Sequence, residues 1–235
     1  MFTAADGREI MLAVASDGAG SAPRSAEGAS MAVEQFLEDI GPAVVDDPEL
    51  AFLDRPYVVS WLQKLRNSID EVSTASGCRA DDFACTFLAA VVGPTRTAYI
   101  QLGDGAIVVA GSEANEYSWV FWPQHGEFAN STNFVTQNDF ESAVEVETTD
   151  APVNEVAIFT DGIERLVLDM QAKTVHSPAL IPIFGWLSGL DPRTEIGGPA
   201  AALVAFLGSG RVNDRTDDDK TLVMATRLRR PAAVN

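Results

Sequence analysis

Residues 84–122 read ACTFLAAVVGPTRTAYIQLGDGAIVVAGSEANEYSWVFW. Short runs of β-branched and aromatic residues alternate here with Gly, Pro and Asp, which favour turns. This alternation is typical of antiparallel strands joined by tight connections. The stretch therefore predicts a β-meander in the middle of the chain.

The segment before the meander predicts one strand and two helices. Residues 9–16 (EIMLAVAS) are mostly apolar and lead into Asp17-Gly18, as expected for a strand that enters a tight turn. Pro56 suits the first turn of a helix. Two stretches repeat apolar residues at the three- and four-residue steps of one helix face. They are Ala29, Ala32, Val33, Phe36, Leu37 and Ile40, and then Val58, Trp61, Leu62, Leu65, Ile69 and Val72. We expect Phe36 and Trp61 to lie in the core.

The segment after the meander returns to mixed structure. Residues 123–141 are rich in Gly, Asn, Ser and Thr without periodicity and predict a long loop. Because helices and strands cluster in separate blocks, we predict an α+β fold in which helix pairs pack on two antiparallel sheets. We expect residues 1–235 to form a single domain. The further elements predicted are strands near 143–149 and 154–160, helices at 178–190 and 198–208, and a last strand at 220–227.

Composition narrows the possible functions. No run approaches the roughly 20 apolar residues that a membrane span needs, and no secretory signal follows Met1, so we expect a cytoplasmic protein without a membrane partner. The net charge of −18 argues against binding nucleic acid, whose phosphates require a basic surface. Cys78 and Cys85 do not form a CxxC pair, so we expect buried free thiols rather than a zinc site.

Three aspartates share a local context. Asp17, Asp104 and Asp161 each follow an apolar strand and precede a glycine, which lets the backbone turn sharply. A fourth acidic group, residues 217–219, comes directly before the final strand. If these strand ends meet at one rim, their carboxylates require a counter-charge, and all-oxygen ligands suit Mg²⁺ or Mn²⁺. Asp-Gly is also a common turn, so each pair taken alone is more simply structural.

The motifs around these residues resemble those of the type 2C metal-dependent protein phosphatases, in particular their compact bacterial branch. The similar segments are SDGAGSAPRSAEGASMAV, ACTFLAAVV, YIQLGDGAIVV, GEFANSTNFVT, FTDGIERL and DDDKTLVMA. They occur in the family's order and span roughly residues 10–227. The resemblance implies a four-layer α-β-β-α sandwich of two antiparallel sheets flanked by helix pairs.

The resemblance also implies roles for individual residues. Asp17 would bridge two metal ions, Mn²⁺ or Mg²⁺, and Gly18 would offer its carbonyl to the second. Asp161 and Asp218 would complete the ligands of the first, and Asp104 with Asp161 would hold a third, looser ion. Asp17, Asp161 and Asp218 are thus the expected catalytic residues. The substrates would be phosphoserine and phosphothreonine in proteins, with a cognate Ser/Thr kinase as a further partner, and the loop 123–141 would match the family's flap.

The sequence departs from the family at two points. Many members place a proton-donating His two residues after the bridging Asp, where this chain has Ala19. The family also begins with an earlier strand that carries a phosphate-binding Arg and a metal-contacting Asp, about twenty residues before the bridging Asp. Only sixteen residues precede Asp17, and Asp6 and Arg8 lie too close to it to fill those roles. We therefore expect this strand to be missing and one sheet edge to be incomplete.

Metal-dependent hydrolysis of phosphoserine and phosphothreonine is the leading hypothesis. The alternative is a catalytically weak or inactive phosphatase-like module that binds phosphoproteins or a regulatory partner. An acidic calcium-binding domain is disfavoured because no DxDxDG loop occurs, and a haloacid-dehalogenase-type phosphatase because no DxDx(T/V) motif follows a strand. Among other residues, we expect no catalytic role for His125 and His176, structural roles for Asn130 and Thr132, and a surface role for Arg24.

Overall fold

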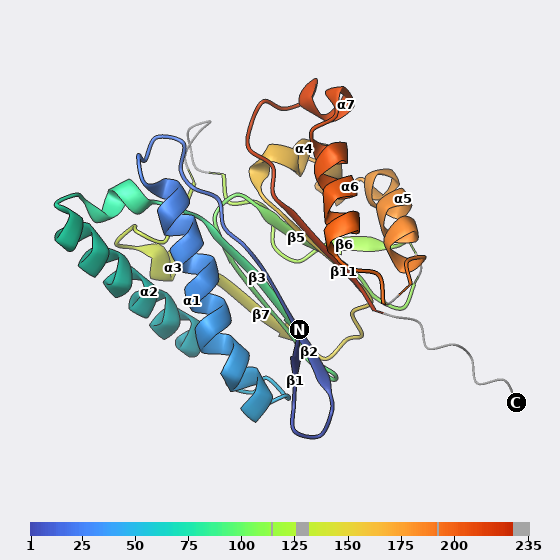
Figure 1. Ribbon diagram of the computed structural model, residues 1–235, viewed down its shortest axis with the longest axis horizontal. Helices are drawn as coiled ribbons and strands as arrows, with labels where there is room; N and C mark the ends of the chain where they lie inside the picture. The colour runs from blue at the N-terminus through green and yellow to red at the C-terminus, as the bar shows by residue number, and fades with distance from the viewer. Residues whose placement is uncertain (114, 126–131, 192, 228–235) are drawn as a thin grey trace, which may run out of the picture.

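The computed structural model describes residues 1–113, 115–125, 132–191 and 193–227. Two antiparallel sheets lie face to face, and helices cover both outer faces (Figure 1). This is the α+β, four-layer α-β-β-α arrangement predicted above. No helix in these ranges is both long and apolar enough to cross a membrane. That residues 1–235 form a single domain stays a prediction.

The first sheet has five strands, and its centre holds only the first two strands of the predicted meander, because the later strands, Ala106–Ala110 and Tyr117–Trp119, pair in the second sheet. β2 pairs with β3 through Ala15↔Leu88, and β3 pairs with β4 through Phe87↔Leu102. All residues of β3 and β4 are buried, as expected for strands covered on both faces. In spatial order the strands are β1 (Phe2–Thr3), β2 (Glu9–Ala15), β3 (Phe87–Val92), β4 (Thr97–Leu102) and β7 (Glu145–Thr149).

The second sheet has four strands. Its centre pairs β8 with both β5 and β11, with Phe159 opposite Ala106 on one side and opposite Leu222 on the other. A separate two-stranded sheet of β9 (Leu168–Asp169) and β10 (Thr174–Val175) lies outside it. In spatial order the four strands are β11 (Leu222–Thr226), β8 (Glu155–Phe159), β5 (Ala106–Ala110) and β6 (Tyr117–Trp119).

Three apolar clusters separate the four layers. The first lies between the first sheet and two long helices, α1 (Ser25–Asp46) and α2 (Arg55–Ser76). The second fills the space between the sheets, and the third lies between the second sheet and the helices α5 (Ser177–Ser188) and α6 (Gly197–Leu207). The shorter helices are η1 (Ala80–Phe83), α3 (Phe140–Ala143), η2 (Asp161–Ile163), α4 (Glu164–Val167) and α7 (Gly210–Asn213).

Local signals explain where α2 begins and ends. The Asp54 side chain accepts a hydrogen bond from the Tyr57 backbone N–H at 2.9 Å, and Pro56 occupies the first turn. Gly77 ends the helix in a left-handed conformation with φ 67°. The predicted core residues Phe36 and Trp61 are both buried, and their rings meet edge to face at 5.2 Å.

Several details differ from the predictions. Leu37 lies at the solvent edge of α1, because the helix face that meets the sheet is narrower than the apolar stripe. Cys85 is buried, but Cys78 is only half-buried, and both thiols are free. The predicted loop 123–141 contains the start of α3, and its residues 126–131 lie outside the described ranges.

β1 occupies the edge at which we expected a missing strand. Phe2 pairs with Ile10 and Thr3 with Glu9, so β1 covers only the first two residues of β2. In the described residues, no strand pairs with this side of β2 from Met11 to Ala15. The edge beside the segment that leads to Asp17 is therefore largely free of strand partners.

Candidate active site

Asp17 is held at the end of β2 by pairing with the start of β3. Its backbone N–H donates to Thr86 Oγ1 at 3.0 Å, and its carbonyl accepts from the Thr86 N–H at 2.8 Å. Gly18 continues the ladder in a bridge to Cys85. A Cβ atom on Gly18 would come within 2.8 Å of Ser25, so only glycine allows the chain to pass this closely to the start of α1.

Asp161 and Asp218 are brought together by the pairing of β8 with β11. Thr160 accepts a hydrogen bond on Oγ1 from the Thr221 N–H at 3.2 Å, which ties the end of β8 to the start of β11. A Cβ atom on Gly162 would lie 1.9 Å from the carbonyl oxygen of Asp219. The glycine after Asp161 is thus required because the acidic run 217–219 crosses directly over it.

Asp104 lies in the turn between β4 and β5. The preceding Gly103 has φ +119°, a conformation that favours glycine, and a Cβ there would meet Thr86 at 2.5 Å. Thr86 therefore contacts two of the turns that carry aspartates, since it also binds the backbone of Asp17. The predicted residues Asp17, Asp104, Asp161 and Asp218 converge at one end of the two sheets, which we call the acidic rim.

Electrostatics show how closely these carboxyl groups interact. Burial, and next the negative charge of Asp161, raises the pKa of the Asp17 carboxyl to about 7, with further contributions from Asp218 and Asp104. Burial and the Asp161 charge likewise raise the pKa of Asp104 to about 6. The pKa of Asp161 is also raised, by burial and then by Asp218. The rim thus concentrates more negative charge than the protein itself compensates.

The donor set of the acidic rim fits a divalent cation. Asp161 Oδ1 is buried and has no hydrogen-bond partner among the described residues. The carboxylate oxygens and the nearby Gly18 carbonyl are the hard oxygen donors that Mg²⁺ and Mn²⁺ prefer. In the described ranges, no three His, Cys, Asp or Glu side chains already stand at metal-ligand spacing. The assignment of a divalent cation to the rim therefore rests on the oxygen donors present and on the unpaired Asp161 Oδ1.

His125 and Lys220 lie close to the rim, whereas the four acidic motifs alone suggest no such neighbours. His125 Nε2 lies 3.0 Å from Glu164 Oε2, and the Glu164 side chain is buried. A positive charge on His125 would oppose the rise that burial causes in the pKa values of Asp104 and Asp161. On the other side, Lys220 Nζ donates to the Asp218 carbonyl at 3.1 Å.

Sequence reasoning gave His125 no role at the site and did not single out Glu164. The available signal was weak: Glu164 follows Asp161 by three residues in FTDGIERL, and nothing in the sequence places His125 near it. His176, by contrast, sits before α5, where its N–H donates to the Val167 carbonyl at 2.7 Å. The structure therefore separates the two histidines that the sequence treated alike.

Gln124 organises the start of the predicted flap. Its Oε1 accepts from the Gly103 N–H at 2.9 Å and from Asn133 Nδ2 at 3.1 Å. Its Nε2 donates to the Ala143 carbonyl at 2.7 Å and to Glu145 Oε2 at 2.9 Å. This residue was missed because hydrogen bonding in a loop leaves no periodic pattern in the sequence. Thr132, predicted as structural, donates to the Gln124 carbonyl at 3.0 Å, whereas Asn130 lies outside the described residues.

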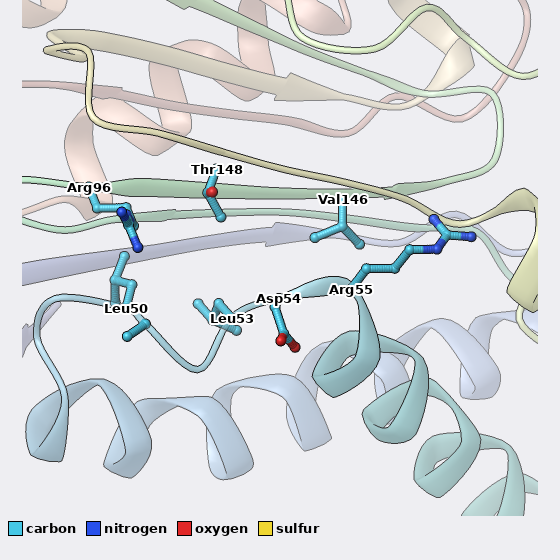
Figure 2. Close-up of a pocket in the computed structure, with 8 residues that line it drawn as sticks. Leu50, Leu53, Asp54, Arg55, Arg96, Val146 and Thr148 are labelled. Atoms are coloured by element: carbon cyan, nitrogen blue, oxygen red, sulfur yellow. The ribbon is translucent and has the colours of Figure 1, made fainter.

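A hollow lies along β7, between this strand and the segment that leads into α2 (Figure 2). Its two guanidinium groups are already engaged, since Arg55 donates to backbone carbonyls of Val144 and Glu141, and Arg96 pairs with Asp150 at 2.8 Å. An anion would have to displace these contacts, so we do not assign the catalytic reaction to this hollow. The residues that line it are Leu50, Ala51, Leu53, Asp54, Arg55, Arg96, Val146 and Thr148.

The comparisons with known proteins agree with the geometry. The family described as Protein phosphatase 2C matches residues 2–208. The chain is 35% identical over 225 residues to serine/threonine-protein phosphatase 3 of Escherichia coli K12, and the match covers 94% of this chain and 85% of that protein.

Solved structures show the same fold at low sequence identity. PppA, described as a key regulatory component of T6SS in Pseudomonas aeruginosa, gives a TM-score of 0.58 at 13% identity, covering 92% of this chain and 88% of that one. The serine/threonine phosphatase Stp1 of Staphylococcus aureus gives 0.55 at 11% identity, covering 96% and 86%.

Proposed function

This chain belongs to the protein phosphatase 2C family of serine/threonine phosphatases, and we propose that it hydrolyses phosphoserine and phosphothreonine esters in proteins in a metal-dependent reaction at the acidic rim. The observation that carries the proposal is the convergence of Asp17, Asp161 and Asp218 from segments far apart in the sequence, where burial and the neighbouring carboxylates raise the pKa values of Asp17 and Asp161.

Two ions, Mn²⁺ or Mg²⁺, are proposed at the rim. Asp17 would bridge them, the Gly18 carbonyl would bind the second, and Asp161 and Asp218 would bind the first. Asp104 and Asp161 would hold a third ion. When bound, such ions lower the pKa of water and neutralise the charge of the phosphoryl group.

The chain's own residues orient these ligands. Thr86 fixes the backbone of Asp17, and the pairing of Thr160 with Thr221 fixes the spacing between Asp161 and the 217–219 run. At the position of the family's proton-donating His, Ala19 is buried and uses its N–H to bind the Ala84 carbonyl at 2.9 Å. Residue 19 therefore supplies no proton, and we assign protonation of the leaving alkoxide to solvent.

The proposal extends to partners and location. We propose phosphorylated proteins as substrates, a cognate Ser/Thr kinase as the enzyme that produces them, and the cytoplasm as the site of action. Neither nucleic acid nor a membrane is a proposed partner. The net charge of −18 supports the first exclusion, since a protein with a large net negative charge repels a phosphate backbone.

The test is metal-dependent turnover by the purified chain. With Mn²⁺ it should hydrolyse p-nitrophenyl phosphate and a phosphothreonine peptide, and a matched phosphotyrosine peptide should be a poor substrate. Asp17→Asn and Asp218→Asn should each lower kcat/KM by about a thousandfold, because each removes a ligand that supplies several kcal/mol of transition-state stabilisation. Asp217→Asn removes the same charge from the same acidic run and should leave kcat/KM within about threefold.

A second candidate function rests on Ala19 and on the short β1. An inactive phosphatase-like module would bind Mn²⁺, measured by isothermal titration calorimetry, and would show no turnover with any phosphopeptide. Full activity of the Asp17→Asn and Asp218→Asn variants would instead contradict the role of the rim itself. The two results are distinct, because the first leaves metal binding intact and the second makes the ligands dispensable.

A further inference from the structure

The side-chain amide of Gln124 uses every hydrogen-bonding position that it has. Its Oε1 accepts from the Gly103 N–H at 2.9 Å and from Asn133 Nδ2 at 3.1 Å, and its Nε2 donates to the Ala143 carbonyl at 2.7 Å and to Glu145 Oε2 at 2.9 Å. A glutamine amide offers two acceptor and two donor positions, so only this orientation satisfies both sides. The amide is therefore fixed between the turn at residue 103 and the start of β7.

Gly103 is bound by Gln124 on both of its peptide groups. Its N–H donates to Oε1, and its carbonyl accepts from the Gln124 backbone N–H at 3.2 Å. The two bonds hold the peptide planes before and after Gly103, and so they restrict both backbone angles of the residue type that is otherwise freest to rotate. The next residue is Asp104, so this restriction sets the direction in which the aspartate leaves the turn.

The same segment reaches Asp104 a second time through Thr132. The Thr132 hydroxyl donates to the Gln124 carbonyl at 3.0 Å. Thr132 is also a hydrogen-bond partner of the Asp104 carboxyl, where it opposes the rise in pKa that burial causes. Because a hydroxyl carries one proton, the carbonyl and the carboxyl share it. Gln124 is thus linked to Asp104 through its main chain as well as through its side chain.

The strands beneath Gln124 give it a rigid support. Gln101 of β4 is fully buried, and its Nε2 donates to the Trp122 carbonyl at 3.2 Å. In the pairing of β4 with β7, Gln101 lies opposite Glu145, which accepts from the Gln124 amide. Residues 122 and 124 are therefore anchored to neighbouring positions of two paired strands. A site held by regular strands is placed more precisely than one held by a loop alone.

We propose that Gln124 is a positioning residue, which holds the Gly103-Asp104 turn so that the Asp104 carboxyl is directed toward Asp161. This inference rests on the proposed function in one respect, namely that Asp104 and Asp161 hold the third ion. In the described residues, no hydrogen bond joins the Gln124 side chain to the segments that carry Asp17 or Asp218. Loss of the amide should therefore weaken the third ion and leave the other two in place.

Amide hydrogen exchange in the metal-free chain tests whether Gln124 holds the turn. Gln124→Leu keeps a side chain of similar size and removes all four hydrogen bonds. With a chelator present, NMR should show exchange of the Gly103 amide at least about tenfold faster than in the wild-type chain, because this N–H loses its acceptor. Amides in the centres of β3 and β8 should exchange as in the wild-type chain. This measurement requires neither metal nor turnover.

Isothermal titration with Mn²⁺ tests the consequence for the ions. Gln124→Leu should raise the dissociation constant of the weakest ion by about tenfold and change the two tighter ones by less than about twofold. Gln124→Glu should do the same, because it sets a carboxylate against the Ala143 carbonyl and Glu145. Adding Glu145→Gln to that variant supplies a donor to the new carboxylate and should recover most of the lost affinity. A residue that only stabilises the fold would not give this selective loss or this recovery.

The matched control is Gln63→Glu, which makes the same substitution at an exposed amide of α2 that donates to Asn67 Oδ1 at 3.0 Å. It should change neither the Gly103 exchange nor the Mn²⁺ affinities. Wild-type exchange of Gly103 in Gln124→Leu would overturn the proposal. So would equal weakening of all the ions, the lack of a third Mn²⁺ in the wild-type titration, or a failure of Glu145→Gln to restore the Gln124→Glu variant. Absence of turnover by the wild-type chain would instead contradict the proposed function, since neither measurement depends on catalysis.

Discussion

The two helical layers of this protein have opposite relations between composition and burial. α1 and α2 are 22 residues each, carry charges on their outer sides and bury one stripe against the first sheet. α5 and α6 carry no charge at all and bury far less. In the first layer the pattern of apolar residues indicates which face is covered. In the second layer it does not, because every face is apolar and only the fold decides which one meets the sheet.

The difference also separates two uses of apolar surface. In the first layer, aromatic rings of helices and sheet interlock, with Phe36 5.2 Å from both Trp61 and Phe87. Such packing stabilises the monomer. In the second layer much of the apolar surface faces outward and adds nothing to the stability of the fold.

The largest expected effect is on the free energy of unfolding, when one aromatic side chain in each of the two helical layers is replaced by alanine. Phe36→Ala should lower the free energy of unfolding by about 3–5 kcal/mol, because it removes a fully buried ring and leaves a cavity. Phe206→Ala should change it by less than about 1 kcal/mol, because this ring is exposed. Urea denaturation at about 1 μM measures both. Equal losses would show that the outer face of α6 is covered within the monomer.

A smaller effect is expected from adding a methyl group to one glycine in each layer. A Cβ on Gly28 of α1 would lie 2.0 Å from the Phe83 carbonyl oxygen, so Gly28→Ala should destabilise the protein by about 1–3 kcal/mol. A Cβ on Gly185 of α5 would meet nothing within 4 Å. Gly185→Ala should stabilise the protein by about 0.5–1 kcal/mol, because alanine favours the helix. Thermal unfolding of the two variants gives the signs, and a destabilising Gly185→Ala would mean that α5 is packed more tightly than the contacts indicate.

The smallest expected effect is the pH dependence of stability that arises from the acidic rim. The rim draws on both sheets, because Asp17 follows a strand of the first sheet and Asp161 follows a strand of the second. The raised pKa values of Asp17 and Asp104 mean that the folded protein holds protons which the unfolded chain releases near pH 4. Their contribution to stability is present below about pH 4 and is lost as the pH rises through about 6 and about 7. It is small because both groups are partly exposed to water.

In the metal-free protein, the melting temperature should therefore fall between pH 5 and pH 7.5. The Asp17→Asn variant should show a weaker fall, since it lacks the group with the higher pKa. Differential scanning calorimetry in the presence of a chelator measures both. Parallel pH profiles in the two proteins would show that Asp17 does not titrate in this range.

Much of the fold was predictable because its signals are local. The strands within 84–122, the face of α2 and the end of the strand before Asp161 all follow from periodicity, β-branching and glycine placement, although the structure divides those strands between the two sheets. The predictions were less accurate where an apolar pattern in the sequence is wider than the surface that the neighbouring elements bury. Leu37 continues an apolar stripe in sequence but lies at the solvent edge of α1, and Cys78 stays half-buried beside Arg24, which donates to its sulfur at 3.1 Å.

The sequence by itself determined the order and type of the main elements and marked aspartates at several strand ends. Only the tertiary structure decided that those strand ends meet, that Glu164 and His125 lie beside them, that Gln124 supports the turn before Asp104, and that α5 and α6 remain exposed. The physical reason is the distance along the chain over which each kind of interaction acts. Periodicity and turn preference act over a few residues, whereas convergence and exposure depend on the pairing and packing of segments up to about two hundred residues apart, as for Asp17 and Asp218.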